Sequence, residues 1–93
     1  MTEKDLQESI IELAGWLGWT CYHTHDSRRS RPGFPDLVLW RGSRLLFVEL
    51  KSATGRLSVA QEQTLDELAE TPAEVYIWRP SSWDQGDIAE LLG

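Results

Sequence analysis

The sequence predicts one α/β domain with a mixed central sheet between helices. Two apolar runs flank Gly42-Ser43, and Gly-Ser between such runs is typical of a two-residue β-hairpin. A helical pattern at 58–70 separates this hairpin from a β-branched and aromatic run at 74–78. A strand, a helix and a strand in this order favour a parallel pair beside the antiparallel hairpin.

The first element is predicted to be a helix that starts after Thr2 and ends at Gly18. Thr2 and Asp5 have the spacing of a capping box, and apolar residues then recur at helical intervals. Gln7 falls inside this apolar stripe, Glu3 lies one turn before it and Glu8 lies on its margin. A polar side chain on a core-facing stripe needs a partner, which is either the backbone or a functional site.

The segment 19–24 is predicted to be a strand. Cys21, His23 and His25 would share one face of it, which raises the question of a zinc site. Alternate residues of a strand spread over about 13 Å, too far for one tetrahedral ion without a bend. We therefore expect structural or solvent-facing histidines, with a phosphate contact as the alternative.

The hairpin brings charged residues together at its open end. With Gly42-Ser43 as the turn, Asp36 lies opposite Glu49, and Lys51 shares the face of Glu49. Two carboxylates suit a hard divalent cation, and a lysine can stabilise the charge that develops at a phosphate. The pattern indicates metal-assisted phosphodiester hydrolysis. The alternative is a strand start at Asp36 and a simple Glu49–Lys51 pair on a solvated face.

Both faces of the hairpin strands carry apolar residues, which predicts a position at the centre of a sheet covered on two sides. After the hairpin, Ser58 and Gln61 form a second capping box at the start of the helix to about Glu70. The strand 74–78 follows, and a last, shorter helix is expected over 82–92.

Charge and composition restrict the class of protein. The chain of 93 residues has a net charge of −6, but residues 28–56 hold seven of its nine basic residues and two acidic ones. Such local polarity is compatible with binding a polyanion, with modest and salt-dependent affinity. One cysteine excludes an internal disulfide, and neither a signal peptide nor a long apolar run is present. We expect a soluble cytoplasmic domain and no membrane partner.

The chemistry-bearing residues resemble a known family. Pro35-Asp36 followed by Glu49-Leu50-Lys51 is similar to the PD-(D/E)XK motif of restriction-endonuclease-like nucleases. The longer pattern resembles the VRR-NUC branch of that superfamily, from about Glu3 to the strand near Trp78. Its segments are Arg31-Pro32-Gly33-Phe34-Pro35-Asp36, Glu49-Leu50-Lys51-Ser52, Gly55-Arg56-Leu57-Ser58 and Gln61. The resemblance implies a restriction-endonuclease-like α-β-β-β-α-β(-α) sandwich.

The resemblance also implies roles for individual residues. Asp36, Glu49 and the Leu50 carbonyl would hold Mg²⁺ or Mn²⁺, and Lys51 would position the attacking water. Glu3 and Gln7 match an acid and an amide four residues apart in the family, with Glu8 as the alternative to either. Gln61 has either a catalytic or only a capping role. The expected contacts to DNA phosphates are Arg28, Arg29, Arg31 and Arg56, where solvated loop arginines are the alternative.

Family members of this size, typical of phages and bacteria, resemble Holliday junction resolvases and act as homodimers. The resemblance therefore implies a cytoplasmic enzyme of a bacterium or a phage-infected host that cuts branched or junction DNA. Five tryptophans in a small domain are compatible with a two-fold partner, although core packing also explains most of them. A non-catalytic DNA-binding or phage interaction module and a less specific nicking nuclease are the alternatives.

Overall fold

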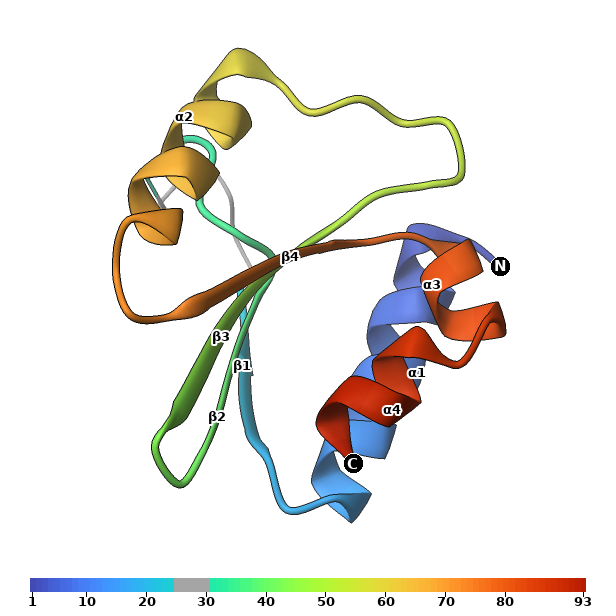
Figure 1. Cartoon of the computed structure of the whole chain (residues 1–93). Coiled ribbons are helices and arrows are strands. Elements are labelled where there is room, and N and C mark those ends of the chain that lie inside the picture. The colour runs from blue at the N-terminus through green and yellow to red at the C-terminus, as the bar shows by residue number, and fades with distance from the viewer. Residues whose placement is uncertain (25–30) are drawn as a thin grey trace.

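The computed structural model describes residues 1–24 and 31–93, which form four helices and four strands (Figure 1). In chain order these are α1 (Glu3–Trp16), β1 (Thr20–His23), β2 (Leu37–Arg41), β3 (Arg44–Leu50), α2 (Val59–Ala69), β4 (Glu74–Trp78), α3 (Pro80–Asp84) and α4 (Asp87–Leu92). The predicted α/β class and order of elements are confirmed.

The four strands form one mixed sheet in the order β1-β2-β3-β4. β2 is antiparallel to β1 and β3, whereas β3 and β4 are parallel. Across the hairpin, Arg41 pairs with Arg44 and Leu37 with Val48, which is the register that the turn predicts. Gly42 has a φ of 60°, the left-handed value that a II′ turn requires at this position.

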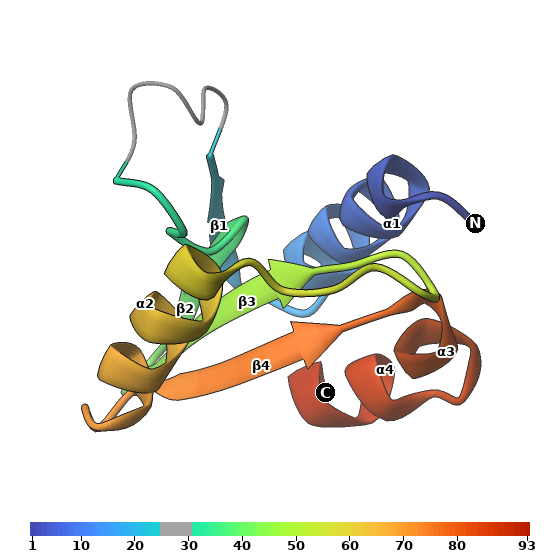
Figure 2. The same ribbon diagram turned by 90° about the horizontal axis from the view of Figure 1, so that it is seen from above.

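One face of the sheet is covered by α1, α3 and α4 (Figure 2), and the main core lies between these layers. The side chains that build it from the sheet are the alternate residues of the strands. They are Leu37, Leu39, Leu46, Val48, Leu50 and Trp78. Leu6, Ile10 and Ala14 face them from α1, and Ile88 and Leu92 from α4. This packing fixes which side of the hairpin is interior.

The opposite face is covered only in part, by α2, which contacts β4. Tyr22, Trp40 and Leu45 keep 55%, 42% and 39% of their surface exposed. The expectation that the hairpin is covered on two sides is therefore wrong for its turn end, because an 11-residue helix does not extend over all four strands. The covered part contains Phe34, whose ring packs edge-on against Phe47 at 6.1 Å.

The last predicted helix is two short helices in the structure. α3 ends at Asp84 and α4 begins at Asp87, and Gly86 between them has a φ of 81°. This left-handed conformation interrupts a helix and favours glycine. The chain thereby turns back, so that Ile88 and Leu92 reach the core. No helix in the described part of the chain is long and apolar enough to span a membrane.

Two arginines at the turn end of the hairpin bind the carboxyl ends of helices. Arg41 Nη1 donates to the Leu17 and Leu92 carbonyls at 2.9 and 3.0 Å. Arg44 donates to the Glu74 carboxylate and to the Leu91 carbonyl. Since helix ends leave unpaired carbonyls that favour cations, both arginines have structural roles. These two members of the basic segment 28–56 therefore bind the protein's own carbonyls and Glu74.

Candidate active site

The site lies at the open end of the hairpin, opposite its turn. Asp36 directly precedes β2, and its Oδ2 accepts a hydrogen bond from the Leu50 backbone N–H at 2.8 Å. Because Leu37 pairs with Val48, Asp36 and Glu49 are the next positions outward on the two strands. The hairpin register thus places the two carboxylates side by side, and Lys51 follows as β3 ends.

Glu49 is the most unusual side chain of the site, since only 2% of its surface is exposed. Its Oε2 accepts a hydrogen bond from Gln61 Nε2 at 3.2 Å and lies 3.9 Å from Lys51 Nζ. Its Oε1 has no hydrogen-bond partner among the residues that the structure describes. A buried carboxylate oxygen without a partner is costly, so the geometry favours a ligand at this atom.

The surroundings raise the pKa of Glu49 from 4.5 to about 8. Burial is the main cause, and the neighbouring Asp36 carboxylate adds repulsion. Lys51 opposes the increase, and the charge of Glu3 adds to it. A cation beside this pair would remove the repulsion and stabilise the ionised form.

Gln61 both caps α2 and contacts the buried carboxylate. Its backbone N–H donates to Ser58 Oγ and its Oε1 accepts from the Ser58 N–H, which completes the predicted capping box. Its Nε2 remains free to donate to Glu49. The structure therefore joins the first turn of α2 to the buried carboxylate.

Gly33 holds the chain before β2 against that same turn of α2. A Cβ atom at Gly33 would lie 2.3 Å from the Ala60 carbonyl oxygen and 2.8 Å from the Gln61 nitrogen, and its φ is 82°. Only glycine accommodates both the conformation and the contact. Gly33 thus keeps the segment before Asp36 packed against the turn of α2 that carries Gln61.

The first turns of α1 complete the site. Glu3, Lys4 and Gln7 line a pocket of about 140 Å³ together with Asp36 and Leu50. Glu3 and Gln7 therefore lie at the same pocket as Asp36. Glu8 is exposed and does not line this pocket.

The donor set fits a magnesium-like ion better than zinc. In residues 1–24 and 31–93, no group of three His, Cys, Asp or Glu side chains is arranged to hold a metal. Mg²⁺ instead takes one or two carboxylates and completes its sphere with carbonyl, water and phosphate oxygens. Asp36 and Glu49, whose Oε1 has no partner within residues 1–24 and 31–93, match the carboxylate part of that pattern.

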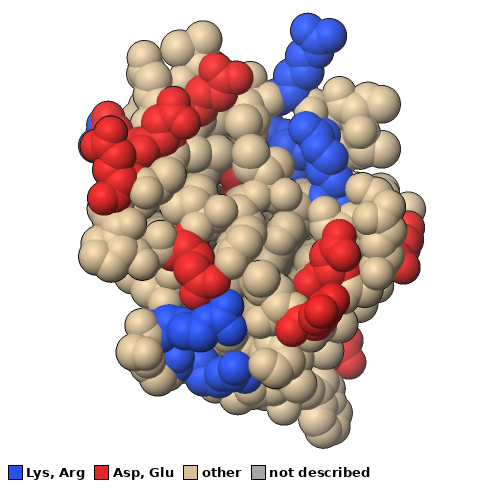
Figure 3. Space-filling view, viewed as in Figure 1, with Lys and Arg blue, Asp and Glu red and all other residues tan. Residues whose placement is uncertain are grey.

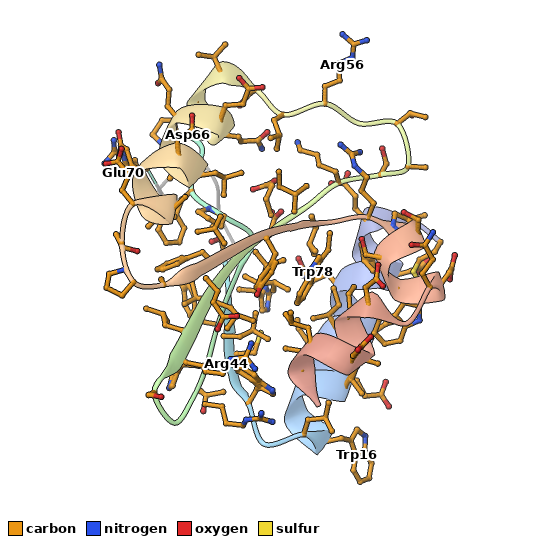
Figure 4. The ribbon with its side chains drawn as sticks, viewed as in Figure 1. Trp16, Arg44, Arg56, Asp66, Glu70 and Trp78 are labelled. Atoms are coloured by element: carbon orange, nitrogen blue, oxygen red, sulfur yellow. The ribbon has the colours of Figure 1, made fainter. Side chains whose placement is uncertain are left out.

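Of the predicted DNA-contacting arginines, the structure describes Arg31 and Arg56, and both are exposed. Arg56 is exposed and extends away from the loop that follows β3 (Figure 4). Arg31 is exposed and lies 3.5 Å from Glu67 of α2. Arg28 and Arg29 lie outside the described residues. In Figure 3, acidic side chains gather over α2, and basic side chains lie near the hairpin turn and near the loop after β3.

Sequence reasoning missed Lys4, which lines the pocket, and Arg79, whose side chain contacts the loop after β3. A signal for Arg79 was present, because it directly follows the predicted strand 74–78. The carboxyl ends of parallel strands meet at one edge of a sheet, so a residue after β4 lies near the end of β3.

A mixed four-stranded sheet between helices, with an acidic pair at the hairpin's open end, defines the restriction-endonuclease-like class. The sequence profile of the VRR-NUC domain matches residues 2–81. The chain belongs to this nuclease family. No curated protein sequence gives a significant match.

Two solved structures are similar to the chain. A VRR-NUC domain protein is 18% identical, with a TM-score of 0.68, over 100% of this chain and 91% of its own. The structure of Archaeoglobus fulgidus Hjc, a Holliday junction resolvase from an archaeal hyperthermophile, is 26% identical with a TM-score of 0.54. That match covers 84% of this chain and 65% of the resolvase chain. These similarities support the fold.

Proposed function

We propose that the protein is a metal-dependent endonuclease that hydrolyses phosphodiester bonds in DNA. The observation that carries this proposal is Glu49, which is 2% exposed and lies beside Asp36 and Lys51. Its Oε1 has no hydrogen-bond partner in the part of the chain that the structure describes. A purely structural Glu49–Lys51 pair would not need the second carboxylate, which raises the pKa of Glu49. Membership of the VRR-NUC family supports the same chemistry.

In the proposed mechanism Asp36, Glu49 and the Leu50 carbonyl hold Mg²⁺ or Mn²⁺. When bound, such an ion polarises a phosphate oxygen and lowers the pKa of water. The Asp36 carboxylate is fixed by the Leu50 N–H, and Glu49 is fixed by Gln61. Both carboxylates are thus oriented before a ligand arrives, which avoids reorganisation during the reaction.

The remaining site residues would act on water and phosphate. Lys51, whose side chain is 15% exposed, orients the attacking water and stabilises charge at the phosphate. Glu3 and Gln7 face the same pocket and would bind water in the outer shell of the ion. Arg28, Arg29, Arg31 and Arg56 would contact backbone phosphates outside the pocket.

We further propose branched DNA as the substrate and a homodimer as the active form, in the cytoplasm of a bacterium or a phage-infected host. The similarity to a Holliday junction resolvase supports the substrate. The exposed apolar side chains of Tyr22, Trp40 and Leu45 support a partner on the incompletely covered face of the sheet. Two copies related by a two-fold axis would present two sites to paired strands.

The test is cleavage of a four-way junction, a linear duplex, a flap and single-stranded DNA by the purified protein, with and without Mg²⁺ or Mn²⁺. Glu49→Ala is the inactive blank, and Glu62→Ala is the matched control, because Glu62 is an exposed glutamate of α2. Paired, metal-dependent incisions confined to the junction support a resolvase. Equal cutting of every substrate refutes the junction preference and leaves a nicking nuclease.

Absence of cleavage above the Glu49→Ala blank would refute the nuclease and favour a DNA-binding module. Sedimentation velocity tests the dimer in the same samples. A Trp40→Glu variant should sediment as a monomer, because it places a charge in the proposed apolar contact. A wild-type protein that remains monomeric with junction DNA would refute the dimer.

A further inference from the structure

Arg79 joins the carboxyl end of β4 to the loop that leaves the active site. Its Nη1 donates to the Ser52 and Gly55 carbonyls at 2.7 and 2.8 Å. Its backbone is fixed at the start of α3, since its N–H donates to Ser82 Oγ and its carbonyl accepts from the Ser82 N–H. The guanidinium therefore extends from a rigid position.

The segment that Arg79 holds is a tight turn directly after Lys51. The Gly55 N–H donates to Ser52 Oγ at 3.0 Å, which closes the turn. A Cβ at Gly55 would lie 2.9 Å from Ser52 Oγ and 3.6 Å from Lys51 Cδ, so the turn lies against the lysine stem. The Lys51 N–H donates to the Trp78 carbonyl at 3.0 Å. Both the backbone and the stem of Lys51 are thus held from the end of β4.

We propose that Arg79 is a positioning residue for Lys51, the lysine of the proposed nuclease. This inference rests on the proposed nuclease function only because it assumes a catalytic role for Lys51. The contacts of Arg79 with the turn after Lys51 do not depend on that function. The ion pair does not fix the lysine by itself, because Nζ and Glu49 Oε2 are 3.9 Å apart. A lysine side chain has about 2 kcal/mol of rotamer entropy. A catalytic lysine ammonium therefore needs packing around its side chain as well as an ion-pair partner.

The geometry favours positioning over a direct phosphate contact through Nη1. Nη1 uses its two hydrogens on two backbone carbonyls, and the arginine side chain is half-buried. A cation that binds phosphate mainly affects DNA affinity and its salt dependence. A positioning residue mainly affects the chemical step, because displacing a catalytic group by about 1 Å lowers the rate roughly a hundredfold.

The first experiment compares Arg79→Met and Arg79→Lys with the wild type in cleavage kinetics. We expect kcat to fall tenfold to roughly a hundredfold in Arg79→Met with KM within about twofold. Arg79→Lys should be intermediate, because its ammonium is one bond nearer the backbone than Nη1. DNA affinity measured in Ca²⁺ should stay within about twofold of the wild type. If the variant instead changes KM, DNA affinity or the salt dependence of DNA binding, and not kcat, the proposal is overturned.

The second experiment measures the mobility of the Lys51 side chain directly and does not require nuclease activity. The chain contains two lysines, Lys4 and Lys51, so ¹³C labelling of lysine Cε gives one signal for each. A held side chain has two inequivalent ε protons, and a mobile one has averaged protons. We expect Arg79→Met to average the Lys51 pair and leave exposed Lys4 unchanged. An unchanged Lys51 signal in the folded variant would refute positioning.

Gly55→Ala disturbs the same turn from its other side and serves as an independent variant. Its Cβ would displace Ser52 Oγ, so the Lys51 signal and kcat should change as they do in Arg79→Met. In the double variant the two losses should be clearly less than additive, because both act on one turn. Full additivity would refute the proposal. If the wild type cuts no DNA, the nuclease fails, but the Lys51 signal still decides the role of Arg79.

Discussion

Replacing Glu49 by glutamine removes the buried charge on which the proposed metal site depends. The side chain keeps its size, and the carboxylate whose pKa is raised to about 8 is lost. Below pH 4.5 the glutamate is protonated in the folded and unfolded chains alike. Between 4.5 and 8 the unfolded chain releases the proton and the folded chain retains it, so the metal-free wild type loses stability as pH rises.

The size of the effect follows from the two pKa values. A difference of one bound proton changes the free energy of unfolding by about 1.4 kcal/mol per pH unit. From pH 5 to pH 8 the wild type should therefore lose roughly 3 to 4 kcal/mol relative to Glu49→Gln. Total stabilities of small domains are about 5 to 15 kcal/mol, so the change is readily measured.

The assay is urea unfolding of both proteins with EDTA at pH 5, 6, 7 and 8. The difference between the two free energies of unfolding isolates Glu49 from other titrating groups. With Mg²⁺ or Mn²⁺ instead of EDTA, the wild type should regain stability at pH 8 and Glu49→Gln should not, because a ligand of the folded state stabilises it by mass action. A difference that stays constant with pH would refute the reasoning about the buried carboxyl.

Three further predictions concern the residues that support the site and the fold. Arg41→Met should destabilise the protein by about 2 to 4 kcal/mol in urea unfolding, since it removes three charged hydrogen bonds and the contact with the Trp19 ring at 4.6 Å. Arg31→Gln is its control and should cost under about 0.5 kcal/mol, because that ion pair is exposed; equal losses would contradict the structure. Gly33→Ala should lower the melting temperature and reduce cleavage, because its Cβ meets the first turn of α2, and a variant as stable and active as the wild type would refute that packing. Gln61→Glu keeps the capping oxygen but places an acceptor against Glu49, so cleavage should fall at least about tenfold while helix content by circular dichroism is unchanged; wild-type cleavage would exclude a role for the amide.

Local patterns predicted most of the fold. The hairpin register follows from a two-residue turn, and a register fixed at the turn extends to Asp36 and Glu49 without further information. The capping boxes at Thr2 and Ser58 are interactions over three residues, and both form as predicted. The division of the last helix at Gly86 was missed, because a glycine within a helical pattern also occurs in continuous helices.

The charge pattern predicted less well than the apolar pattern. Arg41 and Arg44 belong to the basic segment 28–56, but they bind carbonyls at the ends of α1 and α4. An arginine can donate to phosphate, carboxylate or backbone carbonyl. Its partner is therefore decided by which groups the fold brings within reach. No sequence periodicity indicates that partner, whereas the periodicity of apolar residues indicates the buried face of a helix or strand.

The sequence by itself determined the identity of the acidic pair, the adjacent lysine and the order of the elements that carry them. Only the tertiary structure decided that Glu49 is buried, that Gln61 reaches it and that Arg79 holds the turn after Lys51. The features that the sequence determined depend on turn geometry and on the alternation of strand side chains over a few residues. The features that only the tertiary structure decided join residues 12 to 27 positions apart, through the packing of α2 and β4 at one end of the sheet. Such burial and contacts arise only when the layers of the fold assemble.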